Sequence, residues 1–421
     1  MGMTMAEKAL ARASGRKSVG PGEFVTAKID LIMMHDQTFW ASYEVILKGS
    51  RKKVWDADRI VMTIDHGSPA RNLPYAETHV RMRQFADRYG IRNFYDVGTG
   101  ICHQLLPEKG HVLPGQLIVG ADSHTTTYGA FGAASCGIGG SEVAYVLARG
   151  SLWFMVPETI RFILKGTLPM GTSGKDIMLR IAGQYSCEVA QYKAVEFAGP
   201  GAGALDISDR MTICNMGVDI GAKFAFFQAD EKALSYLRAR TDQPLAPFAP
   251  DPDASYRTTY ELDVSVLEPL VACPHNQDNV KSVSELGDVP VHQAFLGSCT
   301  NGRLEDLEKA AAILKGRKVH PRTRLLVLPA SREIFLQALK SGILETLMEA
   351  GAVIGPPTCG PCGGAHLGLL GPGENAISAT NRNFKGRMGS TESFVYLGSA
   401  ETVAASDIEG KIADPRKYLK R

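Results

Sequence analysis

The residues best suited to chemistry stand in short polar segments that follow apolar runs of the sequence. Asp65-His66 follows one run, Cys102-His103 lies a few residues past a second, and Asp122-Ser123-His124 follows a third. A carboxylate beside an imidazole can fix the tautomer of the ring and raise its basicity, as general acid–base catalysis requires. A lone histidine is more often structural, so it is the pairing that makes these groups candidates for proton transfer.

Three of the eight cysteines lie in loops of the same kind. Cys299 stands within Gly-Ser-Cys-Thr-Asn-Gly at 297–302, and Cys359 and Cys362 form a Cys-x-x-Cys pair among prolines and glycines. Three thiolates could hold an iron–sulfur cluster with one open iron, which suits Lewis-acid catalysis. Zinc, a redox pair and structural thiols are the alternatives, although no second Cys-x-x-Cys completes a zinc motif. The other five are interpreted as small buried side chains: Cys102, Cys136, Cys187, Cys214 and Cys273.

Two arginines and a further polar pair complete the candidates. Arg382 and Arg387 follow an apolar stretch at 376–379, and guanidinium groups there would suit bidentate binding of carboxylates, with a plain surface position as the alternative. Asn215 and Asp219 are four residues apart, so a helix over 211–227 would place both on one face. The alternative for this pair is a solvated helix face.

These segments need a scaffold that brings them together, and the sequence predicts parallel α/β sheets. In such sheets, ligands bind outside the carboxyl ends of the strands, where helix N-termini also favour anions. The Asp-His pairs and the three cysteines all follow predicted strands, so we expect one common site. The expected strands span 59–64, 94–97, 116–120, 292–296, 325–328 and 352–354, and the expected helices span 78–89, 304–314, 332–340 and 343–350.

Length, charge and composition exclude several classes of protein. The 421 residues include 46 Lys and Arg against 44 Asp and Glu, and this near-neutral balance argues against a nucleic-acid-binding protein. The most apolar stretch, 151–164, is interrupted by Glu158 and Arg161, so no membrane helix is expected. The N-terminus lacks the features of a signal peptide, which favours a cytoplasmic protein with reduced cysteines. The length suggests two or three domains, and a proline-rich segment at 241–254 predicts a long surface loop.

Taken together, these blocks resemble the aconitase superfamily of iron–sulfur hydro-lyases. Within it, the chain looks like the large subunits of the short, archaeal-type 3-isopropylmalate dehydratases and homoaconitases. The resemblance runs from Pro-Gly-Glu at 21–23 to the last residues, in family order. It rests on Gly-Ala-Asp-Ser-His-Thr at 120–125, Gly-Ser-Cys-Thr-Asn at 297–301, Cys-Gly-Pro-Cys at 359–362 and the block at 381–387.

The resemblance implies three α/β/α domains with mainly parallel sheets around a central iron–sulfur site, with boundaries at 1–158, 159–284 and 285–421. It implies a [4Fe-4S] cluster in which Cys299, Cys359 and Cys362 bind three irons and leave the fourth open. The swivelling fourth domain would be a separate small subunit that carries the catalytic serine, in a heterodimer or heterotetramer. The substrate would be a small hydroxy-dicarboxylate, with no nucleic acid or membrane as partner.

The resemblance also assigns roles to single residues. Ser123, Arg382 and Arg387 match positions that hold substrate carboxylates, and Asn215 matches one in the shell around the fourth iron. Asp219 stands where the family usually has glutamate, so its carboxylate reaches less far by about 1.5 Å. The positions that handle protons and the iron-bound water or hydroxyl are matched by Asp65, His66, His103, Asp122 and His124.

The leading hypothesis is therefore the large subunit of a [4Fe-4S] hydro-lyase that dehydrates and rehydrates a hydroxy-dicarboxylic acid, with 3-isopropylmalate of leucine biosynthesis as the first candidate. Homocitrate, 2,3-dimethylmalate and other alkylmalates are alternative substrates. A metal-binding or cluster-binding scaffold without catalysis is the alternative from another class, and Asp219 is its only support. In the segment His35–Trp40, the bulky Phe39 and Trp40 could reshape the edge of the pocket.

Overall fold

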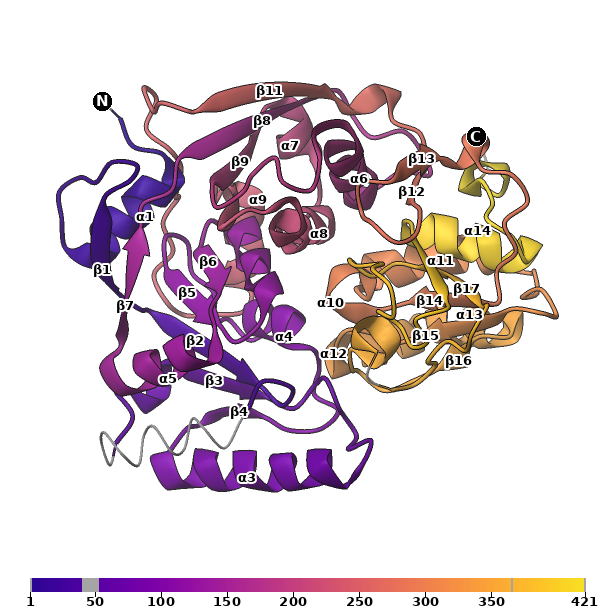
Figure 1. The fold of residues 1–421 in the computed structure, drawn as a ribbon, viewed down its shortest axis with the longest axis horizontal. Coiled ribbons are helices and arrows are strands. Elements are labelled where there is room, and N and C mark those ends of the chain that lie inside the picture. Colours follow the sequence, from indigo (N-terminus) through magenta and orange to yellow (C-terminus); the bar gives the residue numbers. More distant parts are fainter. Residues whose placement is uncertain (1, 40–52, 365, 420–421) are drawn as a thin grey trace.

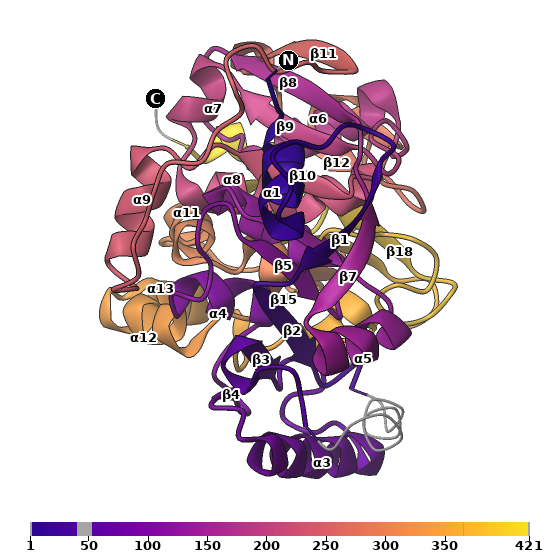
Figure 2. The same cartoon turned by 90° about the vertical axis from the view of Figure 1, so that its left-hand side faces the viewer.

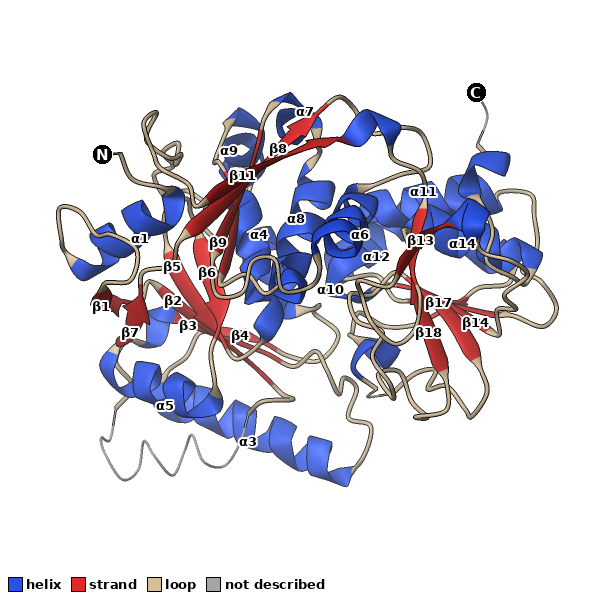
Figure 3. Ribbon diagram, turned by 45° about the horizontal axis from the view of Figure 1, so that its top comes forward, coloured by secondary structure: helices blue, strands red, loops and turns tan. Residues whose placement is uncertain are grey.

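Three parallel or mainly parallel sheets and one small antiparallel ribbon make up the fold of the computed structural model, which describes residues 2–39, 53–364 and 366–419. The elements that run from indigo to purple in Figure 1 surround the first sheet. The orange and yellow elements of the C-terminal part surround the third sheet on the opposite side. Helices flank the sheets throughout, as the colouring by secondary structure shows (Figure 3). In the described residues, no helix combines the length and apolar character needed to cross a membrane.

The first sheet has five parallel strands in the order β4-β3-β2-β5-β6. Its strands are β2 (Leu31–His35), β3 (Ile60–Thr63), β4 (Asn93–Tyr95), β5 (Leu117–Gly120) and β6 (Ala134–Gly137). Its helices are α1 (Met5–Ser14), η1 (Ala57–Arg59), α3 (Leu73–Tyr89), α4 (Cys102–Glu108), η2 (Ser123–Phe131) and α5 (Gly140–Arg149). Helix α3 lies below β3 and β4 in both side views (Figures 1 and 2). Strands β1 (Phe24–Lys28) and β7 (Ser151–Met155) form the antiparallel ribbon.

The second sheet is parallel, with the order β10-β9-β8-β11. Its strands are β8 (Thr159–Lys165), β9 (Ala194–Ala198), β10 (Phe224–Phe227) and β11 (Thr258–Asp263). Its helices are α6 (Gly174–Tyr185), α7 (Pro200–Ala204), α8 (Ile207–Asn215), η3 (Met216–Ile220), α9 (Glu231–Arg238) and η4 (Val264–Val266). The proline-rich segment 241–254 forms the predicted surface loop, without a helix or strand.

The third sheet has seven strands in the order β13-β12-β18-β17-β14-β15-β16, of which β12 and β13 pair antiparallel. The strands are β12 (Leu270–Ala272), β13 (Val280–Ser282), β14 (Gln293–Leu296), β15 (Arg324–Val327), β16 (Val353–Ile354), β17 (Asn375–Ser378) and β18 (Phe394–Leu397). The helices are η5 (Val283–Glu285), α10 (Ser298–Asn301), α11 (Leu304–Leu314), α12 (Arg332–Lys340), α13 (Ile343–Ala350), η6 (Gly360–Gly363), α14 (Ala400–Glu409) and η7 (Pro415–Lys417).

The buried side chains form two clusters, and β2 contributes to both. Leu31 and Met33 point into a large cluster shared by the second and third sheets, whereas Ile32 and Met34 point into a cluster formed mainly by the N-terminal part. Successive side chains of a strand face opposite sides of its sheet, so a strand that is buried on both sides must be apolar at every position. This accounts for the continuous apolar runs from which the strands were predicted.

The predicted elements agree with the structure except in two places. The helix expected over 78–89 begins five residues earlier, as α3 (Leu73–Tyr89), whereas the strand expected at 94–97 is β4 (Asn93–Tyr95). The strands at 60–63, 117–120, 293–296, 324–327 and 353–354 and the helices at 304–314, 332–340 and 343–350 are confirmed within one or two residues. The single helix expected over 211–227 is wrong. Helix α8 ends at Asn215, a 3-10 turn follows, and Gly221 ends it in the left-handed conformation with φ 85° before β10 begins.

The two expected domain boundaries lie differently with respect to the sheets. The boundary at 158 falls between β7 and β8, where one sheet system gives way to the next. The boundary at 284 falls after β12 and β13, although both strands hydrogen-bond within the third sheet. Sheet membership alone therefore favours a boundary between β11 and β12, and the division into three domains stays a prediction.

Candidate active site

Polar loops at the carboxyl ends of strands from the first and third sheets converge on one cavity. From the first sheet come His35 at the end of β2, His66 after β3 and Asp122 after β5. From the third sheet come Cys299 after β14 and Arg382 after β17. The cavity has a volume of about 230 Å³. The position of polar groups after strands, read from the sequence, thus predicted the site.

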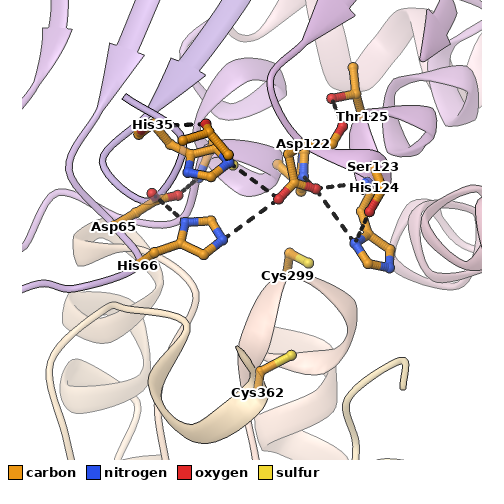
Figure 4. Close-up of polar contacts among 12 residues, drawn as sticks. His35, Asp65, His66, Asp122, Ser123, His124, Thr125, Cys299 and Cys362 are labelled. Carbon is orange, nitrogen blue, oxygen red and sulfur yellow. Dashed lines mark hydrogen bonds and ion pairs between the residues drawn. The ribbon is translucent and has the colours of Figure 1, made fainter. Parts of the chain in front are cut away.

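Asp122 is the centre of the imidazole groups in this cavity. Its Oδ1 lies 2.9 Å from Nε2 of His103 and accepts the backbone N–H of His124 at 2.7 Å. Its Oδ2 lies 3.4 Å from Nε2 of His35 and 3.6 Å from Nε2 of His66. Figure 4 shows the Asp122 carboxylate between these rings, with Cys299 and Cys362 directed towards the same space. Burial raises the pKa of Asp122, but the neighbouring histidines hold it well below its usual range.

Two further carboxylates, those of Asp65 and Asp36, fix the loop after β3. Asp65 Oδ1 lies 2.8 Å from Nδ1 of His66, and Asp65 Oδ2 accepts the backbone N–H of Cys102 at 2.7 Å. Asp36 accepts the backbone N–H groups of His66 and Gly67 at 2.9 and 2.7 Å and lies 3.2 Å from Nε2 of His79. Because Nδ1 of His66 is occupied by Asp65, Nε2 is the nitrogen that remains for the cavity.

The pKa values of two imidazoles of the site, His66 and His103, are shifted in opposite directions. Burial lowers the pKa of His66, but Cys359 and Asp65 outweigh it and hold the pKa well above its ordinary value. Burial lowers the pKa of His103, and its contact with Asp122 does not fully compensate. Environments that separate the pKa values of neighbouring groups are typical of sites that move protons.

The three predicted cysteine ligands all line the cavity and are buried, with 8%, 6% and 6% exposure for Cys299, Cys359 and Cys362. Burial and the neighbouring thiols raise the pKa of Cys299, and burial raises the pKa of Cys359 to about 12. Thiolates in such a place need a positive charge, which iron would supply. The donor set therefore fits an iron–sulfur cluster.

The buried side-chain amides of Asn215 and Asn381 lie next to the thiol of Cys299. Asn215 donates from Nδ2 to Sγ of Cys299 at 3.3 Å and to Thr127 Oγ1 at 2.9 Å. Asn381 donates from Nδ2 to Asn215 Oδ1 at 3.1 Å and to Thr300 Oγ1 at 2.8 Å. Asn215 is fully buried, so the alternative of a solvated helix face is wrong for this residue.

Asp219 lies behind the cavity wall. Its Oδ1 accepts a hydrogen bond from Nε of Arg382 at 2.8 Å, and its Oδ2 lies 3.4 Å from Nε2 of His124. Asp219 is 8% exposed, so the solvated-face alternative is wrong here as well. Burial raises the pKa of Asp219, but His124 and Arg382 lower it to about 2. Asp219 thus orients an arginine and a histidine of the cavity.

Arg387 reaches the cavity from the end of the same loop. Its Nη2 lies 3.8 Å from Sγ of Cys362, and its Nε has no hydrogen-bond partner among the described residues. The residue is half-buried and contacts the exposed ring of Phe384. A guanidinium that lines a cavity can bind an anion there, so an ordinary surface position does not describe Arg387.

Most predicted site residues meet in this cavity, and three stand directly behind it. Asp65, Asn215 and Asp219 contact lining residues without lining the cavity themselves. The lining includes His66, His103, Asp122, Ser123, His124, Cys299, Cys359, Cys362, Arg382 and Arg387.

Sequence reasoning missed several residues of the site. His35, Gln37, Thr38 and Asn381 also line the cavity. His35 is the last residue of β2, at the same carboxyl edge of the sheet as the predicted pairs, and this position could have identified it. Phe39 does not form the pocket edge, because it is buried against the ring of Phe85 at 5.5 Å. Trp40 lies outside the described residues.

Of the other five cysteines, four are buried and Cys187 is partly exposed. The interpretation as buried side chains therefore holds for Cys102, Cys136, Cys214 and Cys273.

Comparison with known proteins agrees with this geometry. The model of the Aconitase family (aconitate hydratase) matches residues 11–288 and 282–410, nearly the whole chain. The chain belongs to the aconitase family. Family membership implies a [4Fe-4S] cluster, and the mainly parallel α/β sheets are those of an aconitase-like fold.

Relatives within the aconitase family span the full length of the chain. It is 51% identical over 99% of both chains to a probable 3-isopropylmalate dehydratase large subunit from Methanothermobacter thermautotrophicus. It is 50% identical over all of both chains to 3-isopropylmalate dehydratase large subunit 1 from Methanopyrus kandleri. A probable methanogen homoaconitase large subunit from M. thermautotrophicus is 47% identical over 99% of this chain and 98% of its own.

The fold also resembles that of proteins of known structure. The crystal structure of holo aconitase X from Thermococcus kodakaraensis aligns with a TM-score of 0.50 and 13% identity, over 87% of this chain and 88% of that one. At this identity the likeness concerns the fold alone.

Proposed function

We propose that this chain is the cluster-bearing large subunit of a hydro-lyase that dehydrates and rehydrates 3-isopropylmalate, a step of leucine biosynthesis. The observation that carries the proposal is one buried cavity lined by three thiols, an aspartate–histidine network and two guanidinium groups. The full-length relatives named as large subunits of 3-isopropylmalate dehydratase support the choice of substrate.

The arginines bind the substrate carboxylates. Arg382 is held at Nε by Asp219, which leaves its terminal nitrogens for a carboxylate, and Arg387 lines the same cavity. Planar guanidinium groups bind carboxylates in a fixed orientation. Ser123 also lines the cavity and can donate its hydroxyl to a substrate carboxylate.

Cys299, Cys359 and Cys362 would hold the cluster. When bound, the cluster supplies an open, Lewis-acidic iron that polarises the hydroxyl group to be eliminated. Asn215 and Asn381 donate towards Cys299 Sγ at 3.3 and 3.8 Å, so amide N–H groups stabilise the thiolate that binding requires.

The histidines move the proton of the departing hydroxyl. His66 is fixed at Nδ1 by Asp65 and presents Nε2 beside Asp122, where it can protonate hydroxide as it leaves and so release water. His103, held between Asp122 and the Tyr128 hydroxyl at 2.9 and 3.2 Å, keeps the Asp122 carboxylate in place. Rehydration uses the same groups in reverse.

The base that removes the proton from carbon would come from a separate small subunit, through the serine that the family resemblance implies. The relatives named as large subunits support such a partner. Loss of a proton beside a carboxylate is difficult, and cationic groups at Arg382 and Arg387 would stabilise the resulting charge.

A homoaconitase is the second candidate, since a relative bearing that name is 47% identical over nearly the whole chain. Both reactions use a hydroxy-acid with several carboxylates and would use the same residues of this chain. The substrate is decided by assaying each acid.

The test is anaerobic reconstitution of the chain with iron, sulfide and its small subunit, followed by assays of 3-isopropylmalate, homocitrate and other alkylmalates for the unsaturated acid. We expect a brown protein that loses activity in air. Cys362→Ser should abolish turnover, whereas Cys187→Ser, which changes a thiol outside the cavity, should leave it intact. A colourless protein that binds zinc in place of iron, or a Cys362→Ser variant with full turnover, would refute the proposal.

A further inference from the structure

Lys175 is a fully buried lysine that the proposed reaction does not use. It is the second residue of α6 in the second-sheet region, with 0% of its surface exposed. Its side chain reaches the loop after β17 in the third-sheet region, where Nζ donates to the backbone carbonyls of Ala379, at 3.0 Å, and Thr380. These two carbonyls directly precede Asn381 and Arg382.

The loop to which Lys175 donates its hydrogen bonds carries two residues of the site, Asn381 and Arg382. Asn381 donates to Thr300 Oγ1 at 2.8 Å and lies 3.8 Å from Cys299 Sγ. Arg382 continues the same stretch of backbone towards the Asp219 carboxylate. A shift of the carbonyls at 379–380 would therefore move a thiolate-supporting amide and a carboxylate-binding arginine together.

Burying the ammonium of Lys175 without a carboxylate partner costs desolvation free energy when no substrate is bound. In the described part of the chain Lys175 forms no ion pair with a carboxylate, and both of its acceptors are neutral backbone groups. The adjacent Asp176 carboxylate is directed to the backbone N–H groups of Leu270 and Ser173, each at 2.8 Å. The first turn of a helix also disfavours a cation. Burial accordingly lowers the pKa of Lys175 to about 8.

Stability does not explain why the chain has this residue. Lys175 has no carboxylate partner among the described residues, so replacing it by an apolar side chain of similar length leaves no buried charge unpaired. A methionine would fill nearly the same space at much lower desolvation cost. The gain must therefore come from what the ammonium does at the site.

The charged groups around the cavity indicate what the ammonium of Lys175 contributes there. Asp122 lines the cavity and Asp219 stands directly behind it, and a dicarboxylate substrate adds two further negative charges. The acidic groups that act most on Lys175 are Asp219, Asp306 and Cys362. Its unneutralised ammonium therefore works in a medium of low polarity, where a charge is felt strongly.

We propose that Lys175 is a positioning residue of the substrate site, which fixes the Ala379–Arg382 loop through its two carbonyl contacts and offsets negative charge so that a dicarboxylate can bind. The inference rests on the proposed function, since a dicarboxylate is the ligand. Lys175 does not line the cavity and acts through Arg382.

The test compares Lys175→Met, Lys175→Gln and Lys232→Met in the reconstituted two-subunit enzyme. Lys232 is the matched control, because its Nζ also donates to backbone carbonyls, those of residues 203–205, but at an exposed position outside the cavity. The measurements are KM and kcat for 3-isopropylmalate, the dissociation constant of succinate by calorimetry on the cluster-loaded enzyme, and the urea midpoint of the cluster-free chain.

We expect Lys175→Met to raise KM and the succinate dissociation constant at least tenfold, with kcat reduced less than threefold and the urea midpoint of the cluster-free chain maintained. Lys175→Gln keeps N–H donors and should show a smaller rise, and Lys232→Met should bind like wild type. Succinate binding within twofold of wild type in Lys175→Met overturns the inference. A lowered midpoint with kcat and KM equally impaired also overturns it, because Lys175 would then support the fold alone.

Failure of the proposed function gives a different result. If the wild-type enzyme converts none of the hydroxy-dicarboxylates, the proposed function fails, and succinate binding still decides the role of Lys175. If wild type turns over and Lys175→Met keeps its KM, the inference alone fails.

Discussion

Replacing Asp219 by asparagine removes the charge that orients Arg382 and His124. The Asp219 carboxylate is 2.8 Å from Nε of Arg382 and 3.4 Å from Nε2 of His124, and the residue is only 8% exposed. The amide of asparagine has similar size but cannot pair with a guanidinium as an ion. We expect Arg382, whose side chain is 23% exposed, to lose its fixed orientation towards the cavity.

The size of the effect follows from the pKa of Asp219. It lies at about 2 in the folded protein against an ordinary value of 3.8, because His124 and Arg382 together outweigh the effect of burial. At about 1.4 kcal/mol per pKa unit, the charged form gains roughly 2 kcal/mol on folding. The pKa is lowered, so this contribution is present above about pH 4 and disappears as pH falls towards 2. At pH 7, Asp219→Asn should therefore cost about 2 kcal/mol of stability.

The effect on catalysis should exceed the effect on stability. A misplacement of about 1 Å of a substrate-binding group can cost on the order of 100-fold in rate. We expect kcat/KM to fall between about 10-fold and 100-fold, chiefly through KM. Asp219→Glu restores the residue usual in the family, but the extra carbon–carbon bond of about 1.5 Å should displace Arg382 and give an intermediate loss.

Anaerobic steady-state kinetics of the two-subunit enzyme and urea unfolding of the cluster-free chain measure both effects. Asp230→Asn is the control, because Asp230 pairs with the buried Arg210 at 2.8 and 2.7 Å, outside the cavity. This control should lose stability and retain its KM. If Asp219→Asn keeps kcat/KM within twofold of wild type, or if the control raises KM to the same degree, Asp219 does not orient the substrate-binding arginine.

Two further predictions concern buried charges. Arg303→Met removes a guanidinium that donates to the carbonyls of Cys299 and Thr300 at 2.9 and 2.5 Å and lies 3.9 Å from the buried carboxylate of Asp306. Because this carboxylate would be left unpaired, we expect a loss of about 3 kcal/mol in urea unfolding. Faster iron release on desalting should accompany it, and wild-type iron retention would show that Arg303 does not fix the Cys299 loop. Asp407 is fully buried, and neither of its carboxylate oxygens has a hydrogen-bond partner among the residues that the structure describes. Burial raises its pKa to about 8, from 3.8. Since the folded state then binds a proton that the unfolded state has lost, stability should fall between about pH 4 and pH 8. Asp407→Asn should remove this slope of about 1.4 kcal/mol per pH unit, and parallel stability profiles of variant and wild type would contradict the assignment.

Local patterns in the sequence predicted much of the scaffold. The apolar runs gave the strands after which the site residues lie, because strands buried on both faces are apolar throughout. Amphipathic spacing gave the helices of the C-terminal part, and Ser331 caps α12 by accepting the backbone N–H of Ile334 at 3.1 Å. The rule that ligands bind beyond the carboxyl ends of parallel strands then placed the histidines and cysteines together.

The segment around Asn215 and Asp219 shows where local patterns fail. Their spacing of four fits one helix face, yet the helix ends at Asn215 and a 3-10 turn carries Asp219 towards Arg382. Polar residues spaced four apart give the same sequence pattern whether they form an exposed helix face or a buried polar network. Burial against residues more than 80 positions away separates them, as in the contact of Asn215 with Cys299.

The sequence by itself determined the kinds of chemical group, the strands that present them and, through its motifs, the family. The tertiary structure decided which groups meet and how each is charged. It made Asp122 the partner of four imidazoles, moved Asp219 behind Arg382 and buried Lys175 against the carbonyls of a loop 204 and 205 residues away. The physical reason is that desolvation and Coulomb interactions act through space, over distances set by packing, whereas sequence patterns record only local spacing.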